Sequence, residues 1–196
     1  KQAIKTAGSE LDDILFHIGS NYIAVGDIET AVRYFERSYQ ENPDNEQVLN
    51  ELGYFYDQLG FPDKSIHYYN LYLDIDPFNP AVWFNLGIAY NRVSEFEKAI
   101  DAYDYTLVLN ENFYQATFNK ANSLANLERY REAIAVYREY LKQDPENDDA
   151  YCYMGECYLN QGRYRMAQRN YERALRINPN NDIAWFSSGL IHWMEK

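Results

Sequence analysis

One stretch decides the fold of this chain: residues 80–113 read PAVWFNLGIAYNRVSEFEKAIDAYDYTLVLNENF. The apolar positions of its first half have the i, i+3, i+4, i+7 spacing of one helix face: Trp83, Leu86, Gly87 and Tyr90. After a break at 92–94 the helical spacing restarts and runs from Phe96 to Leu107. The stretch therefore predicts two amphipathic helices joined by a tight turn.

The same pattern returns every 34 residues along the chain. A small-residue column keeps the step at Gly19, Gly53, Gly87, Ala121, Gly155 and Gly189, and a proline column at Pro43, Pro77, Pro145 and Pro179. The aromatic columns place five tyrosines at core positions: Tyr56, Tyr90, Tyr103, Tyr137 and Tyr171. A fixed period of this length is typical of stacked units that bury a core only against their neighbours.

The repeat resembles the tetratricopeptide repeat (TPR) family, whose 34-residue unit has Trp, Leu-Gly, Tyr, Ala, Phe and Pro columns. In residues 80–113 the matching positions are Trp83, Leu86-Gly87, Tyr90 and Ala99, with Tyr103 in place of the Phe and Glu111 in place of the proline. The resemblance implies an all-α fold: a right-handed α-solenoid, or superhelix, of antiparallel helix pairs.

The repeat covers nearly the whole chain. Five complete units and one partial unit are expected, at 12–45, 46–79, 80–113, 114–147, 148–181 and 182–196. We expect 12–196 to form a single TPR array, and 1–11 to be the end of a preceding helix or an N-terminal lead-in. The first residue is Lys1, not methionine, so we expect a trimmed or processed chain. Because trimming can remove a targeting segment, the compartment stays open, with the cytoplasm as the default.

Charge and hydropathy exclude several classes of partner. The net charge is −12, and the excess of acidic residues lies in the first three repeats. Such a surface repels phosphate backbones, which excludes nucleic acid as a partner and argues against anionic membranes. No apolar stretch approaches the ~20 residues of a membrane-spanning helix, so no direct membrane insertion is expected.

The sequence contains no pattern typical of catalysis. The histidines His17, His67 and His192 lie in widely separated repeats, and no Gly-rich phosphate loop or metal-spaced His/Cys set occurs. The two cysteines, Cys152 and Cys157, lie about 140° apart around one helix at 100° per residue, so they are not expected to pair. We predict a non-enzyme with no metal and no cofactor.

In the TPR family the first helix of each unit lines a concave groove. The groove-facing columns here pass through Phe84, Phe118 and Cys152, and nine residues are the candidates for partner binding: Asn50, Tyr54, Phe84, Asn85, Asn91, Phe118, Asn119, Asn122 and Asn126. A row of carboxamides can pair with an extended peptide backbone without reading its sequence. Asparagine is also common at this place across the family, and that ordinary background is the alternative.

One basic residue breaks the packing pattern of the fourth repeat. Lys120 occupies a place that is usually apolar, and a buried lysine is unfavourable unless it is paired or extends to solvent. Two interpretations follow: the amine extends past a small neighbour, or it meets an acidic group of a partner.

The sequence therefore predicts a scaffold for protein–protein interaction that binds a partner peptide or protein segment in the groove. Two alternatives remain. The chain is a structural or oligomerisation element that self-associates through its termini, because the helix at 182–196 is apolar on most sides. Or it is the regulatory arm of a larger multidomain protein.

Overall fold

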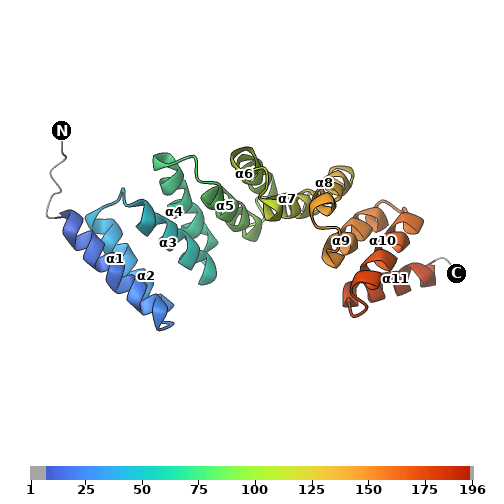
Figure 1. Cartoon of the computed structure of the whole chain (residues 1–196), viewed down its shortest axis with the longest axis horizontal. Helices are drawn as coiled ribbons and strands as arrows, with labels where there is room; N and C mark the ends of the chain where they lie inside the picture. The colour runs from blue at the N-terminus through green and yellow to red at the C-terminus, as the bar shows by residue number, and fades with distance from the viewer. Residues whose placement is uncertain (1–7, 195–196) are drawn as a thin grey trace. The chain divides into compact units, whose positions relative to one another are not determined.

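The computed structural model describes residues 8–194 and, within them, contains eleven helices and no strand (Figure 1). The helices are α1 (Gly8–Ala24), α2 (Ile28–Glu41), α3 (Glu46–Gln58), α4 (Pro62–Ile75), α5 (Pro80–Arg92), α6 (Phe96–Leu109), α7 (Tyr114–Asn126), α8 (Tyr130–Gln143), α9 (Asp148–Asn160), α10 (Tyr164–Ile177) and α11 (Asp182–Met194). The all-α prediction is confirmed.

Four helix pairs form as the repeat predicts: α1 with α2, α3 with α4, α7 with α8 and α9 with α10. The odd-numbered helices α3, α5, α7, α9 and α11 begin at Glu46, Pro80, Tyr114, Asp148 and Asp182, which is a step of 34 residues. We call the odd-numbered helices first helices and the even-numbered ones second helices. The helix α1 begins at Gly8, before the predicted repeat start at 12, so it includes the end of the predicted preceding helix or lead-in at 1–11; residues 1–7 lie outside the described residues.

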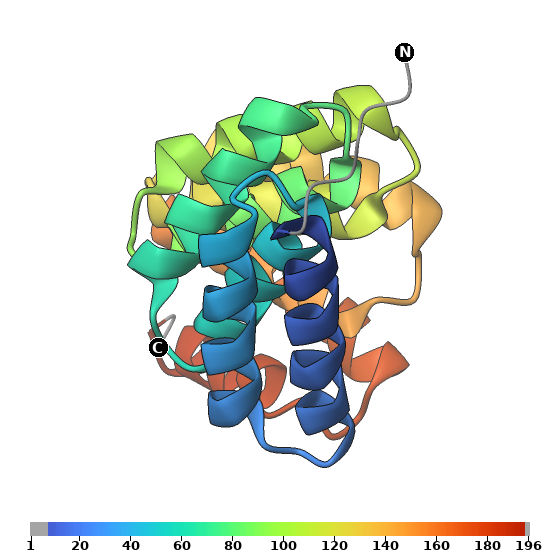
Figure 2. The same ribbon diagram turned by 90° about the vertical axis from the view of Figure 1, so that its left-hand side faces the viewer.

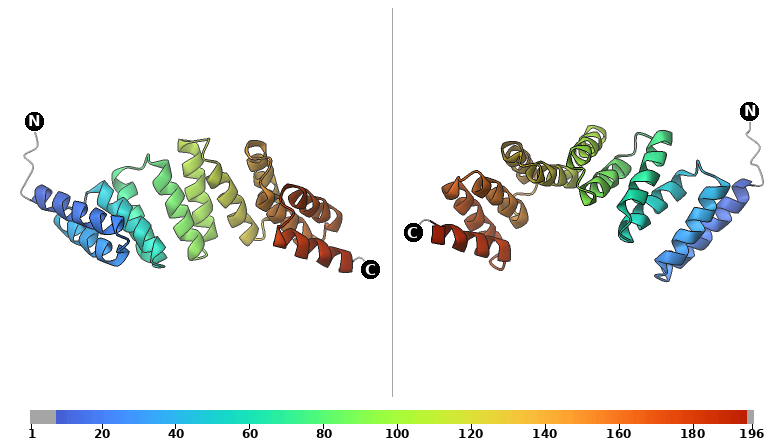
Figure 3. Two further views of the ribbon diagram at one scale, coloured as in Figure 1. Left: turned by 60° about the horizontal axis from the view of Figure 1, so that its bottom comes forward. Right: turned by 180° about the vertical axis from the view of Figure 1, so that it is seen from behind.

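The chain divides into two compact units, residues 1–95 and 96–196. Unit 1 contains α1 to α5 and unit 2 contains α6 to α11, so the division falls inside the predicted repeat 80–113. Within each unit a helix packs mainly on its neighbours in sequence. Figure 2 shows α1 and α2 side by side with the chain reversing between them, and Figure 3 shows α9, α10 and α11 following one another at the end of unit 2.

The two helices of a repeat meet at the small-residue column. A Cβ atom built on Gly53 of α3 would lie 2.5 Å from Cε1 of Tyr69 on α4, and one on Gly155 of α9 would lie 2.8 Å from Cε1 of Tyr171 on α10. In the first repeat a Cβ on Gly19 would lie 2.7 Å from Cε1 of Phe35. These distances are shorter than carbon atoms tolerate, so in these three repeats the aromatic ring of the second helix occupies the space that a side chain would need.

The tyrosine column supplies the rings of the core. Tyr69, Tyr103, Tyr137 and Tyr171 are all at most 1% exposed. Of the five tyrosines predicted as core, four are buried and Tyr90 is half-buried. Because each helix pair has only two layers, large aromatic side chains contribute much of the apolar area that it buries.

Asparagines stabilise the starts of four first helices. Asn45, Asn79, Asn147 and Asn181 each stand just before such a helix and accept a hydrogen bond from a backbone N–H of its first turn. A side-chain cap of this kind contributes about 1 kcal/mol. The helix α7 is the exception, because Phe113 precedes it and provides no side-chain cap.

The turn inside each repeat needs a left-handed residue. At positions 26, 60, 94, 128 and 162 the φ angles are +83°, +79°, +61°, +59° and +68°. Glycine occupies three of these positions, but Ser94 and Glu128 occupy the other two. A residue with a Cβ is disfavoured in this conformation by roughly 1–2 kcal/mol, so these two turns carry a local strain that the other three avoid.

The glycine contact gives a testable difference between two positions on first helices. Gly53→Ala should lower the free energy of unfolding by about 2 kcal/mol, because the buried ring of Tyr69 must move to admit the methyl group. Gly189→Ala is the matched control: nothing lies within 4 Å of its Cβ, so the better helix propensity of alanine should leave stability unchanged or raise it by up to about 1 kcal/mol. Urea unfolding followed by circular dichroism measures both, and equal effects would contradict the contact.

Candidate functional site

The predicted partner-binding residues of unit 1 lie on two first helices. Asn50 and Tyr54 belong to α3, and Phe84, Asn85 and Asn91 belong to α5. Tyr54 is 45% exposed and its ring meets that of Phe55 edge to face, and the other four are half-buried. All five therefore keep surface that a ligand could contact.

One of these residues, Asn85, is contacted from the core by Tyr69 of the second helix α4. Burial raises the pKa of Tyr69, the charge of Asp57 raises it further, and a hydrogen bond with the Asn85 side chain opposes these effects. The hydroxyl of Tyr69 thus reaches the predicted groove residue Asn85 although the ring is buried. Burial also raises the pKa of the Glu51 carboxyl on the same first helix as Asn50 and Tyr54.

The basic residue at the end of α5 is already paired. Nε of Arg92 lies 2.9 Å from Oδ1 of Asp57, whose side chain is largely buried. Burial raises the pKa of Asp57, and the charge of Arg92 opposes that shift. Asp57 offsets the positive charge of Arg92, so Arg92 would attract an anionic ligand less strongly than an unpaired arginine would.

In unit 2 the predicted anchor Phe118 belongs to an aromatic cluster. Its ring centroid lies 5.1 Å from that of Tyr140, 5.9 Å from that of Tyr153 and 6.0 Å from that of Tyr137. The side chain is half-buried. Phe118 therefore packs among three tyrosines and does not project alone into solvent.

The carboxamides of α7 differ in their surroundings. Oδ1 of Asn122 accepts a hydrogen bond from the hydroxyl of Tyr137, which leaves the Nδ2 donors of Asn122 without a partner in the described chain. Asn119 is half-buried and Asn126 is exposed. The hydroxyl of a core tyrosine thus occupies the oxygen of Asn122 and leaves its amide as the group that could donate to a ligand.

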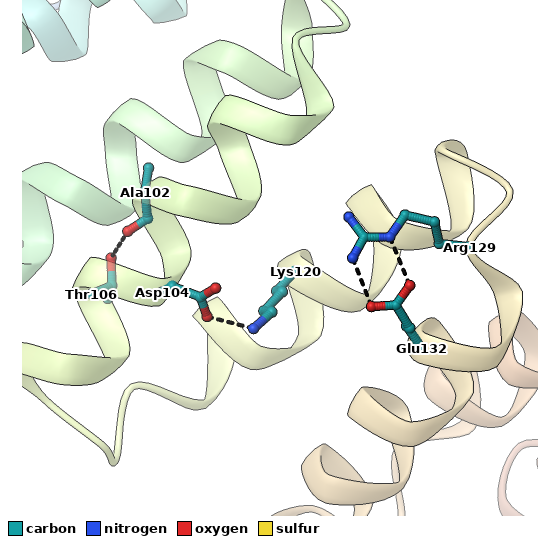
Figure 4. Close-up of polar contacts among 6 residues, drawn as sticks. All are labelled: Ala102, Asp104, Thr106, Lys120, Arg129 and Glu132. Atoms are coloured by element: carbon teal, nitrogen blue, oxygen red, sulfur yellow. Dashed lines mark hydrogen bonds and ion pairs between the residues drawn. The ribbon is translucent and has the colours of Figure 1, made fainter.

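Lys120 is paired within unit 2. Its Nζ donates to Oδ1 of Asp104 on α6, and the lysine side chain is 23% exposed (Figure 4). This ion pair accounts for a lysine at a packing place, and it uses the charge that the second interpretation assigned to a partner. Figure 4 also shows the two-point ion pair between Arg129 and Glu132, just beyond the turn at Glu128.

A pocket of about 510 Å³ opens beside Asn122 and lies entirely within unit 2. It is lined by α7, by the turn after α7, and by α8 and α9, through Asn122, Ala125, Asn126, Glu128, Tyr130, Tyr137, Tyr153, Glu156, Cys157 and Asn160. Tyr137 and Tyr153 stack at 6.4 Å with 24° between their planes. Burial raises the pKa of Tyr130, and the nearby charges of Glu128 and Glu156 act in the same direction.

The pocket includes two predicted site residues, Asn122 and Asn126, and eight that the prediction omitted. Tyr153, Glu156 and Asn160 continue the groove columns into the fifth repeat, so the columns themselves could have identified them. Tyr137 was predicted only as a core residue. Its column of buried aromatic residues does not indicate that its hydroxyl reaches Asn122 at the pocket.

The placement of Cys152 on the groove face is wrong. Its side chain is 0% exposed, and its thiol donates to Oδ1 of Asn181, which caps α11. The small thiol fits beneath the cap of the next first helix, whereas the larger Phe84 and Phe118 in the same column are only half-buried. Cys157 is also buried, at 1% exposure, although it forms part of the pocket lining.

Among residues 8–194 no group of three or more His, Cys, Asp or Glu side chains is arranged to hold a metal ion. In the same part of the chain no helix combines the length and apolarity needed to cross a membrane.

The helix pairs and their contacts define a helical-repeat scaffold for protein interaction. Models of the tetratricopeptide repeat match residues 22–86, 84–148, 118–164 and 148–181, so the chain belongs to the tetratricopeptide repeat family. Members of this family are generally non-catalytic scaffolds. No curated protein matches the sequence.

Solved structures share the fold. MamA is 24% identical with a TM-score of 0.83, covering 87% of this chain and 93% of its own. YrrB, described as a TPR protein with an unusual peptide-binding site, is 18% identical with a TM-score of 0.82, covering 94% and 98%. TTC0263 of Thermus thermophilus, a thermophilic TPR protein, is 19% identical with a TM-score of 0.62, covering 93% and 99%.

The two thiols give a prediction about alkaline pH. Burial raises the pKa of Cys152 and of Cys157 to about 12, from an ordinary value of 9.0. Both thiols should therefore resist Ellman's reagent at pH 8 in the folded chain and react once it is unfolded in urea. Since the folded state holds these protons more tightly, their contribution to stability is complete below about pH 9 and is lost as pH rises toward about 12.

A double cysteine variant is the control for this pH dependence of stability. The double variant Cys152→Ala, Cys157→Ala should show a shallower fall in the free energy of unfolding above pH 9, whatever its stability at pH 7. Rapid reaction of either thiol in the folded chain at pH 8, or an unchanged slope in the double variant, would contradict the burial described above.

Proposed function

We propose that the chain is a non-enzymatic scaffold whose first helices bind an extended segment of a partner protein. The observation that carries the proposal is the hydrogen bonding of Asn122, which lines the pocket. Its oxygen accepts from the Tyr137 hydroxyl, so its amide hydrogens are the groups that remain to donate to a carbonyl group of a peptide.

Other groups support a peptide as the ligand. Asn126 and Asn160 line the same pocket with further carboxamides, and the aromatic walls offer apolar contact beside them. In unit 1, Asn50, Tyr54, Phe84, Asn85 and Asn91 supply a second set of the same kind. Backbone pairing with a few aromatic contacts is a common mode of peptide recognition. The shared fold with YrrB, which is described as having a peptide-binding site, also favours this class of ligand.

A random 12-residue peptide library tests the proposal. Peptides selected on the wild-type chain should bind at least about tenfold more weakly to the variant Asn122→Ala, Asn126→Ala, because both carboxamides are lost while no packed ring is removed; tenfold corresponds to about 1.4 kcal/mol. Fluorescence anisotropy with a labelled peptide measures the affinity. Phe118→Ala is unsuitable, since its contacts with three tyrosines make it a change in packing as well.

The control for this experiment is Arg165→Ala, an exposed position on α10 outside the pocket. It should leave the affinity within about twofold. Selected peptides that bind the double variant as well as the wild type would overturn the assignment of unit 2's pocket as a peptide site.

A second candidate function, self-association, is favoured by α11. Trp185, Phe186 and Trp193 of this helix are 62%, 74% and 75% exposed, an unusual concentration of apolar surface. If this face joins two copies of the chain, light scattering should show a dimer for the wild type and a monomer for Phe186→Ser, Trp193→Ser. A wild-type monomer at all accessible concentrations would rule this function out.

A further inference from the structure

The pocket of unit 2 has a feature that the backbone-pairing proposal does not use. Of its ten lining residues two are acidic, Glu128 and Glu156, and none is basic. Within the described chain no lysine or arginine forms an ion pair with either carboxylate. Arg129, next to Glu128 in sequence, is instead held by Glu132 with two contacts of 2.6 and 2.8 Å. The pocket therefore carries two acidic side chains without an ion-pair partner in the described chain, and the basic residues Arg129 and Arg131 line an adjoining pocket with Glu128.

The walls between the carboxylates are aromatic. Tyr130, Tyr137 and Tyr153 line the pocket, and the last two are stacked on each other. A cation over a tyrosine face is attracted by the electrons of the ring, and the planar guanidinium of arginine also stacks on it. Burial raises the pKa of Tyr130, and the charges of Glu128 and Glu156 raise it further, as expected for a ring beside two carboxylates.

The third observation is the backbone of Glu128. In the repeats of 12–45, 46–79 and 148–181 the matching turn position is glycine, with the same positive φ and the same N–H bond to the carbonyl three residues earlier. At +59°, Glu128 adopts a conformation that disfavours a side chain, and the residue lines the pocket. Strain of this kind persists where the surrounding structure holds it in place, and it is concentrated at functional sites. Folding alone would be served better by glycine.

We propose that this pocket binds the guanidinium group of an arginine in the partner segment, with Glu128 and Glu156 supplying the charge and the tyrosine faces the walls. The inference rests on the proposed function, because it identifies one side chain of the bound peptide. The five N–H donors of a guanidinium match the acceptors present, which are two carboxylates and the carboxamide oxygens of Asn126 and Asn160. A volume of about 510 Å³ accommodates one such side chain with water around it.

A small probe tests the pocket separately from peptide binding. Nα-acetyl-arginine-N-methylamide is titrated into the full ¹⁵N-labelled chain, together with its citrulline counterpart, which has nearly the same shape and no charge. The arginine probe should give saturable shifts at the amides of Glu128, Tyr153 and Glu156, and the citrulline probe should bind at least about fivefold more weakly. Equal binding of the two probes, shifts confined to other residues, or no shift up to the solubility limit would each overturn the inference.

Two variants separate the charge of Glu128 from its place in the turn. Glu128→Gly should raise the unfolding midpoint, because the strain is relieved, and should weaken the arginine probe about fivefold or more. Ser94→Gly is the matched control: its φ of +61° is relieved in the same way, so its midpoint should rise with no change in affinity. Glu156→Gln removes the second charge without touching the turn and should also weaken the probe. An unchanged affinity in both Glu128→Gly and Glu156→Gln would contradict the proposal.

The peptide library distinguishes this inference from the function on which it rests. Selected peptides should contain arginine, and replacing that arginine with citrulline should weaken them as it does the probe. If selected peptides depend on Asn122 and Asn126 but show no preference for arginine, the inference fails and the peptide scaffold stands. If the arginine probe fills the pocket but no peptide is selected, the scaffold proposal fails and the cation pocket remains.

Discussion

The structure depends on a steric constraint between the two helices of a repeat. A small residue on the first helix leaves room for the aromatic ring of the second, as Gly53 does for Tyr69, and a larger side chain there would have to displace the ring. The contact fixes how closely the helices of a pair approach. It also fixes which side of the second helix is turned inward, so the tyrosine hydroxyl lies beside the residues of the neighbouring first helices. Core packing and the shape of the candidate site thus have one physical origin.

The helices and their pairing could be predicted from the sequence because a 34-residue period repeats the same constraints along the chain. Residues in one column share one structural role, so a departure at a single position does not change the predicted helix. The predicted starts at 46, 80, 114, 148 and 182 coincide with those of the first helices for this reason. Columns fail where a residue departs from the consensus, as with Cys152, whose burial depends on the cap of the helix that follows.

The candidate site was predictable only in part. Asn122 and Asn126 were identified because they lie on the exposed side of a first helix, which periodicity does reveal. Glu128 was not identified, because a turn residue belongs to no amphipathic pattern. Its distinguishing feature is a positive φ angle, which the sequence does not reveal. Tyr137 was missed for another reason: its ring is core and its hydroxyl belongs to the site, so a single classification could not describe both ends.

The turn at position 128 has a consequence for how such a protein could change during evolution. A residue that contacts ligand from a hairpin turn is decoupled from the interlocked rings that hold the repeats together. Exchange at this one codon would alter ligand preference while leaving the architecture intact. Three other repeats have glycine at this turn position. Replacing any of these glycines with a residue that has a side chain could create a new specificity at a modest loss of stability.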